Sequence, residues 1–276
     1  MRLTQPLTGL FATAALAAAG LVAILPNPLA AQPALVQQPA VKLDVPYVPT
    51  PPAVVKRMLE LAKVTKDDFH MDLGCGDGRI AVMAAKDFGA RSLGIDIDPK
   101  RIEEANANAK DAGVSDRATF RQANLFETKI ADASVLTMYL LPSVNLQLRP
   151  RILSEMKPGT RVVSHAFTMG DWTPDHQEQV EGRNVMMWIV PAQIDGGWTV
   201  KQGDTTFTVD VKQQYQTFTG TAKIQGQEIP ITDGRIDGTQ ISFRADLGKG
   251  AQTFTGQVDG NSIKSGDGPA WTATRT

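Results

Sequence analysis

Apolar residues recur along this chain in two different rhythms. Between residues 50 and 190, short continuous apolar runs alternate with stretches in which apolar side chains recur every three or four positions. The first rhythm is typical of buried β-strands and the second of amphipathic helices. Because parallel strands are joined through helices, the alternation predicts a doubly wound α/β sheet.

Caps and turn residues predict where these elements begin and end. Thr50 precedes two prolines and is expected to cap the first helix, whereas Gly113 is expected to end the helix that starts after Asp98. Pro150 is expected to interrupt the last helix. The expected strands are 69–73, 91–97, 118–122, 134–141, 161–167 and 183–190, and the later helices are 80–88, 99–112 and 143–156.

From Gly196 onward the pattern changes, with few helix formers and many Thr, Gly, Gln and Asp residues. The segment Gln216–Gly220 recurs identically as Gln252–Gly256, and Asp-Gly pairs at 237–238 and 259–260 lie between apolar residues. An Asp-Gly pair in that setting is the strongest short signal for a β-hairpin. We therefore expect a small antiparallel sheet or barrel built of hairpins.

The N-terminal segment has the layout of a secretory signal peptide. Arg2 is the only charged residue before Lys42, and it is followed by a continuous apolar stretch from Leu10 to Leu25. A Pro-Asn-Pro break and a few small residues come next, as at a signal-peptidase site. We expect an exported protein, periplasmic or secreted, with an uncleaved membrane anchor as the second choice. Residues 1–31 are thus a predicted signal peptide, 32–43 a linker, 44–194 the α/β domain and 195–276 the hairpin-rich domain.

Composition excludes several classes of function. The 28 basic and 29 acidic side chains give a net charge of −1, so no broad cationic surface for nucleic acid is expected. A single cysteine cannot form an intrachain disulfide. The three histidines are far apart in sequence and show no metal-ligand spacing, so we expect no metal site.

The glycine-rich segment from Asp72 to Gly78 follows a predicted strand and precedes a predicted helix. Its spacing differs from the dinucleotide fingerprint Gly-x-Gly-x-x-Gly, because the third glycine comes one position early and Arg79 takes its place. No Gly-Lys-Ser/Thr follows, which excludes a phosphate loop. Asp72, just ahead of the first glycine, repels a phosphate but suits an ammonium group.

A second carboxylate, Asp96, ends the next strand. A carboxylate at this position can accept hydrogen bonds from both hydroxyls of a ribose. The implied ligand has an amino-acid end and a ribose but no phosphate, a description that S-adenosylmethionine fits.

Residues 44 to 190 resemble a class I, seven-stranded S-adenosylmethionine-dependent methyltransferase. The resemblance is greatest to the mitochondrial protein-lysine N-methyltransferases of ATP synthase subunit c and the adenine nucleotide translocase, with their prokaryotic relatives. It rests on Pro46–Thr50, on Asp72–Ile80 and on Trp172–Asp175. The implied fold is a Rossmann-like seven-stranded methyltransferase sheet, followed here by a small antiparallel β domain to which the resemblance does not extend.

The resemblance also implies roles for individual residues. Backbone at Gly74, Gly76 and Gly78 would hold the methionine part of S-adenosylmethionine, with Asp72 near its ammonium. Asp96 would hold the ribose, and Thr50, together with Tyr47, would close the site. Relatives usually have an aspartate that reads the adenine amino group, where this chain has Asn124, whose amide oxygen can still accept a hydrogen bond.

Methyl transfer requires mainly a positioned nucleophile and a site without water. Tyr139, at the end of the fourth predicted strand, is the candidate catalytic residue, although a purely structural tyrosine is an equal alternative. His165 is expected to be structural, and Asp171, Trp172 and His176 are expected to lie in loops that shape the entrance for the substrate.

Three functions stay open at this point. The first is an exported methyltransferase acting on a protein lysine, and the second is a methyltransferase acting on a small molecule. The third is a non-catalytic binding scaffold in which the C-terminal β domain contacts a partner or the cell envelope.

Overall fold

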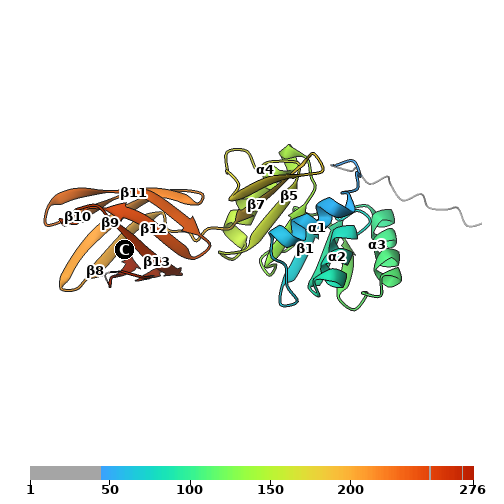
Figure 1. Ribbon diagram of the computed structural model, residues 1–276, viewed down its shortest axis with the longest axis horizontal. Coiled ribbons are helices and arrows are strands. Elements are labelled where there is room, and N and C mark those ends of the chain that lie inside the picture. Colours follow the sequence, from blue (N-terminus) through green and yellow to red (C-terminus); the bar gives the residue numbers. More distant parts are fainter. Residues whose placement is uncertain (1–44, 249, 269) are drawn as a thin grey trace, which may run out of the picture. The chain divides into compact units, whose positions relative to one another are not determined.

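The computed structural model describes residues 45–248, 250–268 and 270–276. The predicted signal peptide and linker lie outside the described residues. Residues 45–189 form a seven-stranded sheet with helices on both faces, and residues 196–275 form a closed barrel of eight strands (Figure 1).

The strands of the sheet are arranged in the order β3-β2-β1-β4-β5-β7-β6. The first five are parallel, and β7 runs antiparallel to both β5 and β6. Their bounds are β1 Phe69–Leu73, β2 Arg91–Asp96, β3 Ala118–Gln122, β4 Val135–Met138, β5 Arg161–His165, β6 His176–Val180 and β7 Arg183–Ile189. The strand order reverses between β1 and β4, which is where open α/β sheets bind their ligands.

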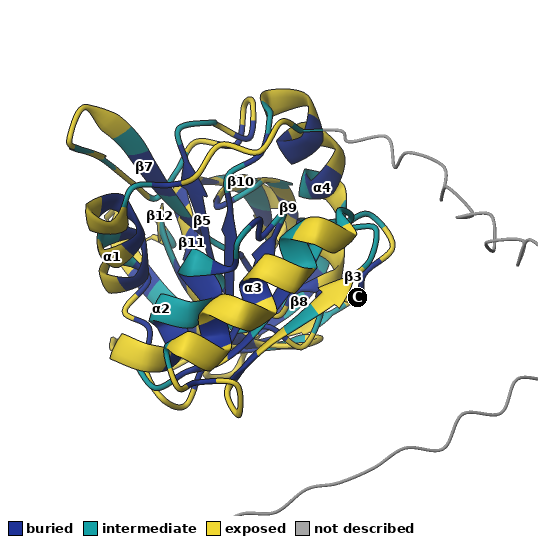
Figure 2. Cartoon of the chain, turned by 90° about the vertical axis from the view of Figure 1, so that its right-hand side faces the viewer, coloured by how far each residue is buried: buried dark blue, intermediate teal, exposed yellow. Residues whose placement is uncertain are grey.

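The helices are α1 Pro52–Leu61, α2 Arg79–Asp87, α3 Pro99–Asp111 and α4 Pro142–Glu155. Two hydrophobic cores lie on opposite faces of the sheet. On one face, α1 and α2 pack on Val135, Val163 and Val185, and on the other, α4 packs on Leu136, Val162 and Met186. The faces alternate because neighbouring residues of a strand point in opposite directions. Figure 2 shows that α3 keeps an exposed outer surface.

Most predicted elements are confirmed within one to three residues, with three corrections. Helix α4 runs through Pro150 without a break. Thr50 does not cap α1: Pro51 occupies that position, and the hydroxyl of Thr50 hydrogen-bonds to His165 instead. Strand β6 was missed, so His176 lies in a strand and not in a loop. Its sequence HQEQV has no apolar alternation, because most of its side chains are exposed.

The C-terminal part is a barrel in which each strand pairs with the next and the last pairs with the first. Both Asp-Gly pairs lie in hairpin turns, where Gly238 and Gly260 have φ angles of 58° and 55°. The two copies of the repeat place Phe218 and Phe254 against the ring of Phe243, so aromatic side chains fill the interior. The strands are β8 Gly196–Gln202, β9 Thr205–Gln214, β10 Thr217–Ile224, β11 Gln227–Asp237, β12 Gln240–Ala245, β13 Gln252–Asp259, β14 Ser262–Ser265 and β15 Thr272–Arg275.

Candidate active site

A cavity lies at the carboxyl ends of β1, β2 and β4, beneath residues 45–50. We call these six residues the N-terminal strap. Of the eight predicted site residues, six line this cavity: Thr50, Asp72, Gly74, Gly76, Asp96 and Tyr139. The sequence motif and the topological switch point therefore coincide.

The backbone amides of the glycine loop are already engaged within the protein. The amides of Gly74 and Cys75 donate to the carbonyl of Ile95 at 2.8 and 2.9 Å, and that of Gly78 donates to Cys75 at 2.9 Å. The amide of Gly76 donates to Oδ2 of Asp96 at 2.8 Å. A phosphate-binding loop needs free amides at this position. These four are occupied, and Asp72, Asp77 and Asp96 surround them, so the loop is unsuited to an anionic ligand.

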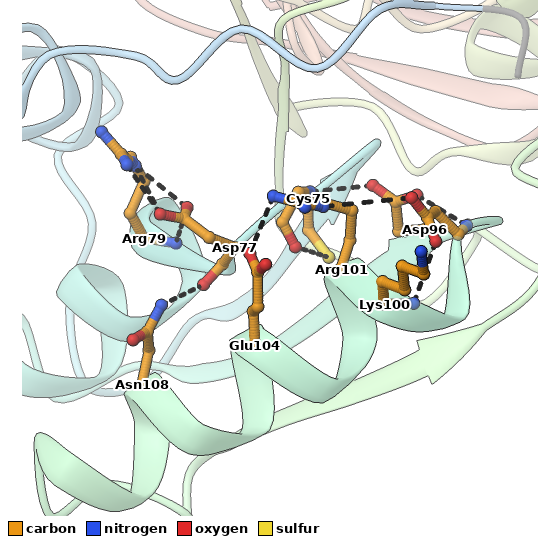
Figure 3. Close-up of polar contacts among 10 residues, drawn as sticks. Cys75, Asp77, Arg79, Asp96, Lys100, Arg101, Glu104 and Asn108 are labelled. Atoms are coloured by element: carbon orange, nitrogen blue, oxygen red, sulfur yellow. Dashed lines mark hydrogen bonds and ion pairs between the residues drawn. The ribbon is translucent and has the colours of Figure 1, made fainter.

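Asp96 joins the glycine loop to the end of β2. Besides accepting from Gly76, its carboxylate accepts through Oδ1 from the amide of Asp98 at 2.9 Å (Figure 3). Each carboxylate oxygen can accept a further hydrogen bond. The side chain is therefore fixed in position and retains the capacity to accept from two hydroxyl groups.

Asp72 is the buried carboxylate of the site, with only 2% of its surface exposed. Its Oδ1 accepts from the hydroxyl of Thr137 at 2.7 Å, whereas Oδ2 has no hydrogen-bond partner. Burial raises the pKa of Asp72 to about 7, and the charges of Asp96 and Asp77 act in the same direction. A buried, half-satisfied carboxylate that lines a cavity fits the ammonium group of an amino acid.

The N-terminal strap is fixed to the glycine loop by an aromatic ring and an ion pair. The ring of Tyr47 lies against Gly76, and the guanidinium of Arg101 lies 4.4 Å from the centre of that ring. Arg79 forms a bidentate pair with Asp77 and donates to the carbonyl of Thr50 at 3.0 Å. Figure 3 shows Asp77 between Arg79 and Asn108, while Arg101 comes from the facing helix α3.

The two remaining predicted residues lie outside the cavity lining. Gly78 has a φ of 77°, and a Cβ there would come within 2.6 Å of the ring of Phe120, so the close packing of α2 on β3 requires glycine. Asn124 uses its Oδ1 to accept from the amide of Phe126 at 2.9 Å. Its side chain stabilises the turn after β3 in this structure.

Tyr139, which follows β4, is the second tyrosine in the cavity lining. Its ring centre lies 3.8 Å from that of His165 and 6.0 Å from that of Phe167. His165 is fully buried and hydrogen-bonds through Nδ1 to Thr50 at 3.0 Å. Burial lowers the pKa of His165 to about 4, so its ring is neutral at neutral pH. Tyr139 therefore contributes an aromatic ring to the cavity lining, and that ring packs on a neutral histidine.

The segment Trp172–Asp175 contributes to the core and does not line the cavity. Trp172 is fully buried and stacks on Tyr215, with ring centres 5.9 Å apart. Asp175 accepts from Arg235 at 2.8 Å, and the carbonyl of Thr173 accepts from Gln216 at 2.7 Å. The expectation that Trp172 shapes a substrate entrance is therefore wrong: the segment joins the sheet to residues of the barrel.

Sequence reasoning missed Asp77, Arg79 and Arg101, which hold the strap. The sequence signal that could have indicated Arg79 is its position, because a charged residue there begins a helix with an apolar face.

Among the described residues, no group of three His, Cys, Asp or Glu side chains is arranged to hold a metal ion. In the same part of the chain, no helix has the length and apolar character needed to cross a bilayer.

Strand order, glycine loop and paired carboxylates define a class I S-adenosylmethionine-dependent methyltransferase. Residues 72–176 match the family model described as the ANTKMT methyltransferase domain. The chain belongs to the protein-lysine N-methyltransferase family: it is 52% identical over 142 residues to the protein-lysine N-methyltransferase of Saccharolobus islandicus, and the match covers 88% of that protein and 51% of this chain.

Two further relatives match the same part of the chain. The adenine nucleotide translocase lysine N-methyltransferase of mouse is 33% identical over 134 residues, which cover 58% of that protein and 48% of this chain. A crystal structure described as an RNA methyltransferase from Salinibacter ruber, in complex with S-adenosyl-L-homocysteine, is 54% identical. It covers 53% of this chain and 96% of its own, with a TM-score of 0.52.

Proposed function

We propose that this methyltransferase transfers the methyl group of S-adenosylmethionine to a lysine amine of a protein. The observation that carries the proposal is the aromatic ring of Tyr139 in the cavity lining, which packs on the neutral ring of His165. The names of the Saccharolobus and mouse relatives support the same acceptor.

The cavity residues divide between the two parts of the cofactor. Asp72, whose Oδ2 is unpartnered, would accept from the ammonium, and Asp96 would accept from the ribose hydroxyls. The absence of a Cβ at Gly74 and Gly76 lets Leu140 and Tyr47 pack closely against the glycine loop at the edge of the cavity. Tyr47 and the other strap residues would cover the cofactor and exclude water.

The cofactor supplies a methyl group already activated by a positively charged sulfur. An acceptor amine must first lose its proton, which passes to bulk water before the amine enters the cavity, and an uncharged aromatic surface favours this loss by lowering the pKa of the amine. The Tyr139 end of the cavity would therefore bind a lysine side chain and promote its deprotonation. No general base is required, and transfer then depends on positioning.

The acceptor class can be tested with purified protein and radiolabelled S-adenosylmethionine. Label is followed into a cell extract that is then treated with protease, with ribonuclease or by removal of small molecules. The expected result is label in protein, released as methyllysine by acid hydrolysis. Label in RNA, or in the small-molecule fraction alone, would contradict the lysine proposal, and no label together with no cofactor binding would favour the scaffold.

We also propose that the protein acts outside the cytoplasm. Support comes from the single basic residue and the apolar stretch within residues 1–31. Contact of the C-terminal barrel with the cell envelope is part of the same hypothesis. A fusion of residues 1–43 to a reporter that is active only after export tests the location, and an inactive reporter would contradict it.

A further inference from the structure

Four polar side chains form a continuous hydrogen-bonded row across the centre of the sheet. Ser92 of β2 lies 2.6 Å from Nδ1 of His70 on β1, whose Nε2 lies 2.8 Å from the hydroxyl of Thr137 on β4. That hydroxyl donates to Asp72 of β1 at 2.7 Å. His70 is paired with Ser92, and Asp72 with Thr137, in the strand register. All four are buried, with 2% exposure or less.

The chemistry of Asp72, at one end of this row, determines which group donates each hydrogen bond as far as Ser92 at the other end. An ionised carboxylate only accepts, so Thr137 must donate its one proton to Asp72, and its oxygen must then accept from His70. Burial lowers the pKa of His70 to about 3, so the ring is neutral and carries one proton, which lies on Nε2. Nδ1 therefore accepts from the hydroxyl of Ser92.

We propose that Ser92, His70 and Thr137 are positioning residues that hold Asp72 as an ionised acceptor for the ammonium of the cofactor. This inference rests on the proposed function of Asp72. The row occupies Oδ1 with a fixed donor, so that Oδ2 is the oxygen left for the ligand. Each hydrogen bond polarises the next, which strengthens the donation to the carboxylate.

The row opposes several influences that disfavour the charge on Asp72. Burial is the largest, and the carboxylates of Asp96 at the end of β2 and Asp77 in the glycine loop add to it. The Cys75 thiol is also near, but burial raises its pKa so that it stays neutral. Across the cavity, Arg79 of α2 is paired with Asp77, and Arg101 of α3 lies over Tyr47. The hydrogen bond from Thr137 lowers the pKa of Asp72.

The decisive variant is Thr137→Val, which keeps the shape of the side chain and removes the donor. If its loss raises the pKa of Asp72 by about one unit, the affinity for S-adenosylmethionine falls about tenfold at pH 6 and less than about twofold at pH 8.5. Titration calorimetry across this pH range measures the change. Thr137→Ser restores the hydroxyl and should restore the wild-type profile, whereas His70→Phe should give a weaker shift in the same direction.

Thr160→Val is a matched control, because Thr160 is also buried but lies in the turn before β5. It should leave the pH profile unchanged. Nitrogen-15 NMR of the full chain offers an independent readout that does not depend on binding: His70 should be protonated on Nε2 and unprotonated on Nδ1.

The outcomes separate this inference from the proposed function. Wild-type protein that does not bind S-adenosylmethionine at any pH would overturn the role of Asp72 itself. If the wild type binds and the affinity of Thr137→Val equals that of the wild type, or is lower by the same factor at every pH, only the positioning role of the row is overturned. The same holds if NMR finds the proton of His70 on Nδ1.

Discussion

The ring of Tyr47 occupies the place that a side chain at Gly76 would need. A Cβ added to Gly76 would lie 2.5 Å from Cε2 of that ring, and the residue has a φ of 53°. The N-terminal strap and the glycine loop are therefore matched to each other at one position.

Gly76→Ala is expected to displace the strap and to weaken cofactor binding by about tenfold or more, because both the ring and the backbone must move. Gly113→Ala is the matched control, since Gly113 has a φ of 70° but open space around it. Calorimetry should show unchanged cofactor affinity for the control. Equal affinities of the two variants would contradict the role of the Tyr47 contact.

Asp96→Asn is expected to reduce cofactor affinity by about one to two orders of magnitude, because a charged acceptor gives the stronger hydrogen bonds to hydroxyl groups. The amide also cannot accept from both Gly76 and Asp98 through two oxygens. Asp116→Asn, at an exposed residue paired with Arg117, serves as control. Unchanged affinity of the Asp96 variant, measured by calorimetry, would exclude it from the ribose site.

Asp72→Asn is expected to separate stability from binding. Burial raises the pKa of Asp72 from 3.8 in the unfolded chain to about 7 in the folded protein. The folded protein therefore disfavours the charged form, and the free energy of unfolding decreases as the pH rises from about 4 to 7. The neutral variant should be more stable than cofactor-free wild type at pH 8, by on the order of 4 kcal/mol, with little difference at pH 4. Urea denaturation at both pH values measures this, and the variant should no longer bind the cofactor. A variant less stable than wild type at pH 8 would contradict the burial argument.

Tyr139→Ala is expected to lower the rate of methyl transfer about a hundredfold, while cofactor affinity changes little, because the ring positions the acceptor. Tyr139→Phe retains the stacking on His165 and should keep most of the activity if the ring is what matters. Single-turnover rates with labelled cofactor distinguish the two. An inactive phenylalanine variant would instead assign the function to the hydroxyl group.

Phe243→Ala is expected to destabilise the barrel by about 3 kcal/mol, because the ring contacts Phe218, Phe254 and Trp271 in the interior. Gln240→Ala, on the exposed side of the same strand, should have little effect. Denaturation followed by tryptophan fluorescence tests this. Equal stability of both variants would mean that the interior aromatic cluster contributes little.

The sequence could predict those elements in which the local pattern of apolar and capping residues matches the burial and contacts found in the structure. The apolar run of β4 and the Asp98 cap of α3 are such cases, and Asp98 does accept from the amide of Lys100 at 2.9 Å. The glycine loop was recognised because its spacing is set by backbone conformation within seven residues.

Features that depend on distant pairing were not predictable in this way. The hydroxyl of Thr50 contacts His165, 115 positions away, so the local cap signal was overridden. The row from Ser92 to Asp72 exists only once β1 is placed between β2 and β4, and nothing in the single strands reveals that register. Asn124 was assigned by analogy to relatives, and its local turn contacts could not be read from the sequence.

The amides of the glycine loop already donate hydrogen bonds within the protein, and this also determines which ligands the site excludes. Adenosine triphosphate and the adenine dinucleotides share the adenosine portion with the methyl donor but carry phosphate groups in place of its amino-acid end. Because its backbone donors are occupied and three carboxylates line the cavity beside it, the loop repels phosphate groups, whereas the glycine loop of a Rossmann dehydrogenase binds them. The charge of the glycine loop therefore disfavours adenosine compounds that carry phosphate groups.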